Sequence, residues 1–365
     1  MKSGLHQKFV QMHLEWFPEF EAHRNCMFIY WHRMYLLGYE NMLRSLGAGY
    51  ECVTLPVWDH LTATAKRSAG LCANMEACAP VITDFGGSKT GKNTNLIIYN
   101  TTIPYQTSWS TAKCITNAPL NSFCGNNTVC AGCVLRGPAS TVSYPAEAYF
   151  GSLYNQMFAY DTWDDFRKAI EEGVHNSVHS NLGGIMMYFQ SPIDPLFYAH
   201  HAFVDALQTI YLKCQLGNGS ATLTAEAKGS DPRFWTSGAR RVSGYYTSND
   251  TVRMYVWDYS KQWAQVTTTP KNLLYKFFKD LPKKFADYID AKDLGIYSYS
   301  YNLTGAMSNM NTNCKASNTI ASTSLLAGDE DAGNAKPLVE DSADSKAHRW
   351  AVALFESARL NGYTK

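Results

Sequence analysis

The chain has 365 residues, of which 45% are hydrophobic and 17% charged, enough for a large core in one or two domains. Its 32 lysines and arginines nearly balance 31 aspartates and glutamates, so no basic surface predicts binding to nucleic acid or to an anionic membrane. No apolar run is long enough to cross a bilayer. Aromatic residues make up 13% of the chain, which favours a large aromatic core over the alternative of an aromatic-lined substrate site.

Ten cysteines and five N-x-[ST] sequons favour a secreted, disulfide-bonded and N-glycosylated protein. The N-terminus has no apolar segment of the kind found in a signal peptide, so we expect a mature or trimmed form of a secreted protein. The sequons begin at Asn100, Asn126, Asn218, Asn249 and Asn302.

In chain order, the predicted elements are mostly helices. Residues 7–16 predict the first, with Pro18 fitting a break soon after it, and apolar residues at helical spacing over 35–46 predict the second. The segment 61–150 has little periodicity and many Gly, Ser, Thr, Asn and Cys residues, which indicates long disulfide-stapled loops rather than a separate domain. Further helices are predicted at 160–174, 271–289 and 347–360, and short strands or packing loops around Tyr245, Tyr246, Trp257 and Trp263.

A histidine pair and a later histidine doublet form one candidate metal site. His175 and His179 are four residues apart, so on a helix they lie on one face, one turn apart. The Gly- and Pro-containing segment 183–195 can fold the chain back and bring His200 and His201 towards them. Neutral imidazole suits copper, zinc, iron or nickel. A pair at this spacing is often only a solvated helix face, so this interpretation depends on a matching half elsewhere.

A second group of histidines lies upstream. His13 follows the apolar run of the first helix, His23 lies in the following loop, and His32 lies at the beginning of the second helix. A lone buried histidine is usually a hydrogen-bonded core residue, but this group matches the downstream one and predicts the other half of a metal site. His6 also lies at a plausible distance, so the choice of His13 over His6 stays open.

The residues around both groups resemble those of the type-3 copper proteins, which comprise tyrosinases, catechol oxidases and molluscan-type haemocyanins. The resemblance is specific because two independent motifs occur in that family's order, and it is closest to tyrosinase-like phenol oxidases. The segments 23–44 and 55–59 resemble the copper-A region, and the segments 175–184 and 194–205 resemble the copper-B region.

The resemblance implies a mainly α fold whose central four-helix bundle holds a dinuclear copper site, with disulfide-stapled loops and a few short strands. It implies a copper domain over residues 1–302 and a C-terminal extension, a linker plus a helix, over 303–365. The implied ligands are the upstream trio, His13, His23 and His32, for copper A, and the downstream trio, His175, His179 and His201, for copper B.

Three further residues receive roles from the resemblance. The family uses the second histidine of the doublet as a ligand, which leaves His200 behind the ligands. Asp205, four residues after His201, is expected to accept a hydrogen bond from an imidazole, with a helix salt bridge or cap as the alternative. Asn176 occupies the position where tyrosinases often carry an asparagine that helps to orient a water for deprotonating monophenols.

The implied activity is that of a secreted phenol oxidase, which uses two copper ions and dioxygen to convert o-diphenols to o-quinones. Monophenol hydroxylation is left open, and the substrate is a small phenol or catechol. The alternatives are a haemocyanin-like protein that binds dioxygen reversibly and a copper-less structural relative, which the six histidines oppose.

The sequence departs from the family pattern at several positions. Tyr30 replaces a turn-setting proline, and Phe166 and Arg167 stand where the glutamate partner of the water-orienting asparagine is expected. Glu21 occupies the place of a cysteine that forms a thioether in many eukaryotic members. Cys26 is expected to be half of a disulfide instead.

Overall fold

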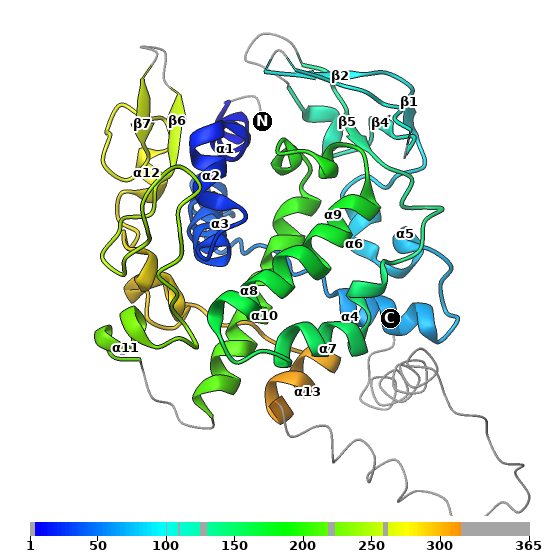
Figure 1. Cartoon of the computed structure of the whole chain (residues 1–365). Helices are drawn as coiled ribbons and strands as arrows, with labels where there is room; N and C mark the ends of the chain where they lie inside the picture. Colours follow the sequence, from blue (N-terminus) through cyan, green and yellow to red (C-terminus); the bar gives the residue numbers. More distant parts are fainter. Residues whose placement is uncertain are drawn as a thin grey trace, which may run out of the picture.

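The computed structural model describes residues 4–99, 101–108, 110–124, 130–217, 223–257 and 262–314 (Figure 1). Helices dominate these residues and the strands are few and short, which confirms the predicted mainly α fold class. The four-helix bundle stays a prediction, as does the domain boundary at residue 302. The predicted helix 347–360 and the sequons at Asn100, Asn126 and Asn218 lie outside the described residues.

Three helices begin the fold: α1 (Leu5–Leu14), α2 (Trp16–Ala22) and α3 (Phe28–Arg44). The break between the first two lies at Glu15, whose extended backbone (φ −67°, ψ 137°) ends α1. Pro18 therefore does not end the first helix; it lies in the first turn of α2, where its missing N–H costs no helical hydrogen bond.

The downstream histidines lie on a second group of helices, α8 (Trp163–Ile170), α9 (Asn176–Leu182) and α10 (Leu196–Leu216). A π-helical turn over Glu171–His175 joins α8 to α9 and contains a kink at Gly173. The Thr162 side chain accepts a hydrogen bond from the Asp165 N–H and so caps the start of α8. In Figure 1 the α1–α3 group lies beside this second group, and α3 packs against α10.

The segment predicted as loops carries more regular structure than expected. Its helices are α4 (His60–Ser68), α5 (Met75–Cys78) and α6 (Pro80–Asp84), and α7 (Phe150–Phe158) follows the segment. Its strands are β1 (Gly91–Lys92), β2 (Leu96–Ile98), β3 (Thr101–Ile103), β4 (Lys113–Ile115) and β5 (Val134–Arg136). They pair antiparallel in the order β1-β4-β5 and as a separate β2–β3 pair. Elements this short show no period that a sequence pattern can reveal.

Disulfides hold this segment and the end of α10, as predicted. They join Cys72 to Cys78, Cys114 to Cys133, Cys124 to Cys130 and Cys214 to Cys314. Cys26 was expected to be a disulfide half, and this is wrong: its thiol is free. The side chain is only 3% exposed and packs against Gly238, where a Cβ would lie 2.8 Å from its Sγ, so the core leaves it no cysteine partner.

The last described part is mostly irregular. It contains α11 (Ala225–Ser230), the paired strands β6 (Tyr255–Trp257) and β7 (Trp263–Gln265), α12 (Tyr275–Phe278) and α13 (Gly305–Asn313). The strands confirm the expectation around Trp257 and Trp263. The helix predicted at 271–289 is wrong, because only α12 and a 3₁₀ turn over Phe285–Ile289 form there. Pro282 lies between them and cannot donate a helical hydrogen bond.

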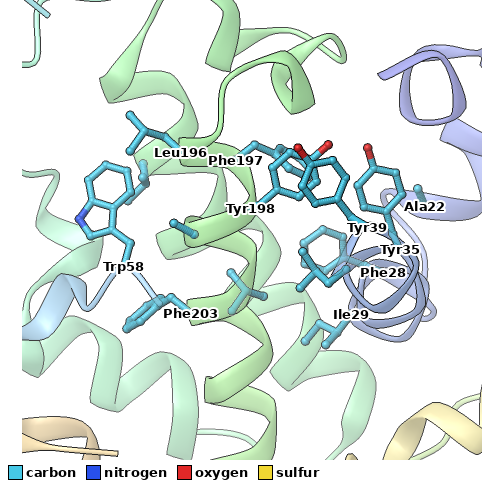
Figure 2. Close-up of a cluster of buried hydrophobic side chains, with 14 of the residues drawn as sticks. Ala22, Phe28, Ile29, Tyr35, Tyr39, Trp58, Leu196, Phe197, Tyr198 and Phe203 are labelled. Atoms are coloured by element: carbon cyan, nitrogen blue, oxygen red, sulfur yellow. The ribbon is translucent and has the colours of Figure 1, made fainter. Parts of the chain in front are cut away.

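Aromatic side chains fill the space between α3 and α10, which confirms the predicted aromatic core (Figure 2). Tyr198 of α10 stacks on Tyr39 of α3 with ring centroids 3.6 Å apart, and Trp58 lies on the other side of α10. Burying each such side chain stabilises the fold by about 1.5–3 kcal/mol. The packing therefore fixes α3 against α10, and with them His32 and His201. None of the described helices combines the length and apolarity needed to cross a membrane.

Candidate metal centre

The structure brings the upstream trio together from three elements. His13 comes from α1, His23 follows the last residue of α2, and His32 lies in the second turn of α3. Their side chains are buried, and one ring nitrogen from each lies within 4.8 Å of the others. His6 is not part of this group, because its ring nitrogens contact the Tyr39 hydroxyl at 3.1 Å and the Ile193 carbonyl at 3.2 Å.

The downstream trio comes from one helical stretch and α10. His175 ends the π-helical turn, His179 lies on α9, and the Nε2 atoms of His179 and His201 are 3.3 Å apart. The two trios adjoin: the rings of His32 and His201 stack with centroids 4.4 Å apart. The six predicted ligands therefore form one buried cluster.

Four of the six imidazoles are oriented by backbone carbonyls. A carbonyl oxygen can only accept, so each contacting Nδ1 carries the hydrogen and each Nε2 offers its lone pair to the cluster. The contacts are His13 Nδ1 with Phe189 O (2.8 Å), His32 Nδ1 with Phe28 O (2.8 Å), His175 Nδ1 with Glu171 O (3.2 Å) and His179 Nδ1 with Met186 O (2.7 Å).

The remaining member of each trio lacks such a contact. The buried Nδ1 atoms of His23 and His201 have no hydrogen-bond partner among the described residues. The nearest acidic group to His23 Nδ1 is a Glu19 carboxylate oxygen at 3.8 Å, beyond hydrogen-bond distance. Each trio thus has two oriented rings and one less constrained ring.

Burial keeps these rings neutral. Loss of solvation lowers the pKa of His13 to about 3 and of His179 to about 4, and it holds the pKa of the other four well below the ordinary value. Over the described residues the groups that could hold a metal consist of histidines alone. Six neutral nitrogen donors in a dry cluster suit copper, which accepts imidazole readily in both oxidation states.

His200 lies as close to the downstream trio as a ligand would. One of its ring nitrogens lies within 4.8 Å of those of His175 and His179, so distance alone groups it with them. Both of its nitrogens have other partners, however: Nδ1 contacts His60 Nε2 at 2.9 Å and Nε2 contacts the His175 carbonyl at 3.3 Å. We give these contacts more weight than proximity, because a ligand needs a free lone pair directed at the metal.

Asp205 does not hold an imidazole, which corrects the first of its two predicted roles. Its carboxylate accepts from Arg33 Nε at 2.6 Å and from the hydroxyls of Tyr299 at 2.6 Å and Tyr301 at 2.5 Å. Both carboxylate oxygens are therefore occupied by groups other than an imidazole. The salt bridge runs to another helix, α3, and not within α10 as the alternative of a helix salt bridge or cap implied. Since Arg33 follows His32, this buried pair joins α3 to α10 next to both trios.

Asn176 lies beside the downstream trio with its side chain exposed. Its Oδ1 lies 3.0 Å from His175 Nδ1, the nitrogen that faces away from the cluster. Glu171 is buried nearby, but its carboxylate accepts from the Arg24 N–H at 2.6 Å and from Arg167 at 3.0 Å. The arginine at the expected glutamate position therefore engages the nearest available glutamate.

Two further groups of residues support the site, a role that the sequence did not predict for them. Arg136 of β5 and Asp194, just before α10, form a fully buried pair with contacts of 2.6 and 2.8 Å. Gly184 packs against the same strand with φ +56°, and a Cβ there would lie 2.7 Å from the Leu135 carbonyl. The strand therefore fixes the chain between α9 and α10.

On the upstream side, two neighbouring arginines hold α2. Arg240 makes two contacts with the buried Glu21 carboxylate at 2.6 and 2.7 Å, and Arg241 contacts Glu19 at 2.6 Å. Arg241 also lies 3.4 Å from the His23 carbonyl. At the position where a thioether was noted as missing, the chain has an ion pair.

Comparison with known proteins agrees with this geometry. The model of the common central domain of tyrosinase matches residues 4–213. Tyrosinase of Streptomyces glaucescens is 33% identical over 236 residues, which cover 60% of this chain and 76% of that protein. A tyrosinase-like protein of Pinctada maxima is 30% identical over 210 residues, which cover 56% of this chain but only 41% of that protein.

A solved polyphenol oxidase from Thermothelomyces thermophila is 18% identical, with a TM-score of 0.47, and the match covers 82% of this chain and 78% of that one. The family assignment depends on the domain match, which spans the histidines of both trios, and on the sequence relatives. The chain belongs to the tyrosinase family of copper oxidoreductases.

Proposed function

We propose that this protein is a secreted phenol oxidase that binds two copper ions and oxidises o-diphenols to o-quinones with dioxygen. The observation that carries the proposal is the cluster of six imidazoles, five buried and one (His179) partly buried, in two adjoining trios. The upstream trio would hold one ion and the downstream trio the other, each through Nε2 where a carbonyl holds Nδ1.

Copper in such a site supplies one-electron exchange with dioxygen, and neutral ligands favour its reduced state. The overall reaction balances when two o-diphenols each lose two electrons and two protons. One dioxygen molecule accepts the four electrons and the four protons and becomes two water molecules. The chain's own contribution is to hold the imidazoles in place and to exclude water, because every predicted ligand is buried or nearly so.

Phe189 supports an aromatic substrate. Its ring is 40% exposed, while its centroid lies 5.3 Å from that of His23 and 6.4 Å from that of His13. The neighbouring Met187 is 41% exposed. A phenol ring that approaches the cluster from this side can pack edge-to-face or offset against Phe189.

The surroundings of Asn176 favour diphenol oxidation over monophenol hydroxylation. The Asn176 oxygen is directed at His175, so it is not free to orient a water. The Glu171 carboxylate is held by the Arg24 backbone N–H and by Arg167, so it is not free to act as a base towards a monophenol. We propose that monophenol hydroxylation is the slower activity.

Secretion is supported by the four disulfides, which need an oxidising compartment to form and persist. Of the five sequons, Asn249 and Asn302 lie within the described residues, and both side chains are exposed. Exposed acceptor asparagines are accessible to N-glycosylation.

The test is to load the full chain with copper and to measure copper content and oxygen uptake with a catechol and with a monophenol. We expect two copper ions per chain and faster uptake with the catechol. Reversible dioxygen binding without turnover would favour the haemocyanin-like alternative. A chain that binds no copper would overturn both.

A further inference from the structure

His200 and His201 are adjacent on α10, both are buried, and both lie beside His175 and His179. Each of these two neighbouring imidazoles is close enough to bind a metal held by His175 and His179. Their positions alone do not determine which of the two is the ligand. The residues behind the pair therefore determine which ring offers its lone pair to the metal.

A chain of two hydrogen bonds fixes the tautomer of His200. The His175 carbonyl can only accept, so His200 donates to it from Nε2–H. A buried neutral imidazole carries one ring hydrogen, so His200 Nδ1 must be an acceptor. Its partner, 2.9 Å away, is His60 Nε2, which therefore donates. His200 then has no lone pair left for a metal.

The fold holds His60 firmly in this position. His60 begins α4 directly after Asp59, whose carboxylate caps the helix by accepting from the Thr62 N–H at 3.0 Å. The Trp58 N–H donates to the Ala199 carbonyl at 3.0 Å, which joins this segment to the turn of α10 that carries the doublet. The His60 ring is fully buried and contacts Phe203 with centroids 4.7 Å apart.

The His60 ring has no other hydrogen-bond partner among the described residues. Nδ1 is buried without a partner, so no described acceptor holds the ring hydrogen on that nitrogen. The only hydrogen bond of this ring in the described structure is the one to His200.

We propose that His60 is a positioning residue that selects His201 as the copper-B ligand. By donating to His200 Nδ1, it holds His200 in the tautomer whose Nε2–H is bonded to the His175 carbonyl. That bond supports the backbone of one ligand, His175, and leaves His201 as the neighbour with a free Nε2. The proposal rests on the proposed copper centre.

The first test reads the tautomer directly. Nitrogen-15 NMR of the imidazoles, on the Cu(I)-loaded chain and on the metal-free chain, distinguishes ring nitrogens that carry hydrogen from those that do not. We expect His200 with hydrogen on Nε2 and His60 with hydrogen on Nε2. Hydrogen on His200 Nδ1 would overturn the proposal. Because the metal-free measurement needs no copper, it stands apart from the test of the proposed function.

The second test compares variants by copper affinity, measured by competition with a chelator. His60→Leu removes the donor, and we expect copper binding at one of the two sites to weaken by roughly tenfold. His60→Gln keeps an N–H donor at a similar reach and should restore affinity. In a His200→Leu background, His60→Leu should cause no further loss, because its effect passes through His200.

Two results would overturn the proposal. One is a His60→Leu chain that keeps full affinity at both sites. The other is a His200→Leu chain that loses one copper while His201→Leu keeps both, which would make His200 the ligand. If His60→Leu fails to fold by circular dichroism, the tautomers in the unaltered chain and the His60→Gln variant still decide the question.

Discussion

The upstream and downstream halves of the centre orient their imidazoles in the same way but are supported by different residues outside the trios. In each half, backbone carbonyls orient two imidazoles and leave a third without a partner at Nδ1. The less constrained ring is His23 upstream and His201 downstream. Because no carbonyl orients these two rings, their positions depend on the residues that support each half from outside.

The outer supports differ in the burial of the pair nearest the ligands. Upstream, one loop holds α2 through the buried Arg240–Glu21 pair and through Arg241, whose side chain is 24% exposed and contacts the His23 carbonyl. Downstream, the start of α10 is held by the Arg136–Asp194 pair, in which both side chains are 0% exposed, and by a second layer of histidines. We therefore expect that breaking the downstream support lowers the free energy of unfolding, and that breaking the upstream support displaces a ligand and lowers copper affinity.

The largest expected effect is the loss of a ligand. His201→Ala removes one of three donors from the downstream trio, so that half should lose its copper. Diphenol oxidation should fall more than about 100-fold, because even losing a residue that supports a ligand costs 10–100-fold. Elemental analysis and oxygen uptake measure both quantities. His6→Ala is the matched control, and two coppers retained in His201→Ala would contradict the prediction.

Low pH should destabilise the folded chain, because both halves contain buried neutral histidines. Burial lowers the pKa of nine histidines; the pKa of His60 falls to about 3 and that of His6 to about 4. In the unfolded chain all nine titrate near 6.5. The unfolded chain then binds more protons below that value. The free energy of unfolding should fall with decreasing pH, by up to about 1.4 kcal/mol per pH unit for each histidine.

The raised pKa values of Glu21 and Glu171 act in the opposite direction, because the folded chain takes up those protons more readily. Nine histidines should outweigh them. Urea unfolding of the metal-free chain, repeated between about pH 7 and pH 5, measures the effect. Copper should move the loss of stability to lower pH because it binds the neutral rings. A urea midpoint unchanged over this range would count against the prediction.

Breaking the buried pair tests the downstream support. Arg136→Met leaves the Asp194 carboxylate buried without its cation, so the free energy of unfolding should fall by about 3–5 kcal/mol. Urea unfolding measures this. Arg44→Met is the control, because Arg44 is 37% exposed in its pair with Glu40 and such pairs contribute at most about 1 kcal/mol. Equal losses in the two variants would remove the contrast in burial.

The smallest expected effect concerns the upstream support. Arg241→Met releases Glu19 and the contact with the His23 carbonyl, so copper affinity of the upstream trio should fall roughly tenfold. In a His201→Ala background only that site remains, so chelator competition reports on it alone. Arg233→Met is the control, because Arg233 pairs with the nearby Asp231 away from the trio. An unchanged affinity would show that the ion pairs do not position His23.

Sequence patterns predicted long features better than short ones. The helix carrying His32 and the helical stretch through His175 and His179 were predicted, because many residues repeat at helical spacing. The helix at 271–289 failed at Pro282, and the short strands of the disulfide-rich segment were missed. Cys26 was assigned to a disulfide because its free, buried state depends on packing against Gly238.

The residue types predicted the chemistry of the centre, but they did not predict how the imidazole rings are oriented. The histidine positions, their order and the surrounding motifs were enough to predict copper and the identity of the six candidate ligands. The carbonyls of Phe189 and Met186 carry no side-chain signature, so their role could not be read beforehand. Asp205 was expected to face an imidazole, and only the packing of α3 on α10 showed that it faces Arg33.

The sequence by itself determined the helical class, the two histidine groups and the presence of disulfides, because these depend on periodicity and on residue chemistry. Which cysteines pair was decided by the tertiary structure. The tertiary structure decided which nitrogen of each ring is available and which neighbour holds it. It also brought His60, which has no motif of its own, to within 2.9 Å of His200. Hydrogen-bond direction depends on contacts between residues 140 positions apart, and no local pattern encodes those.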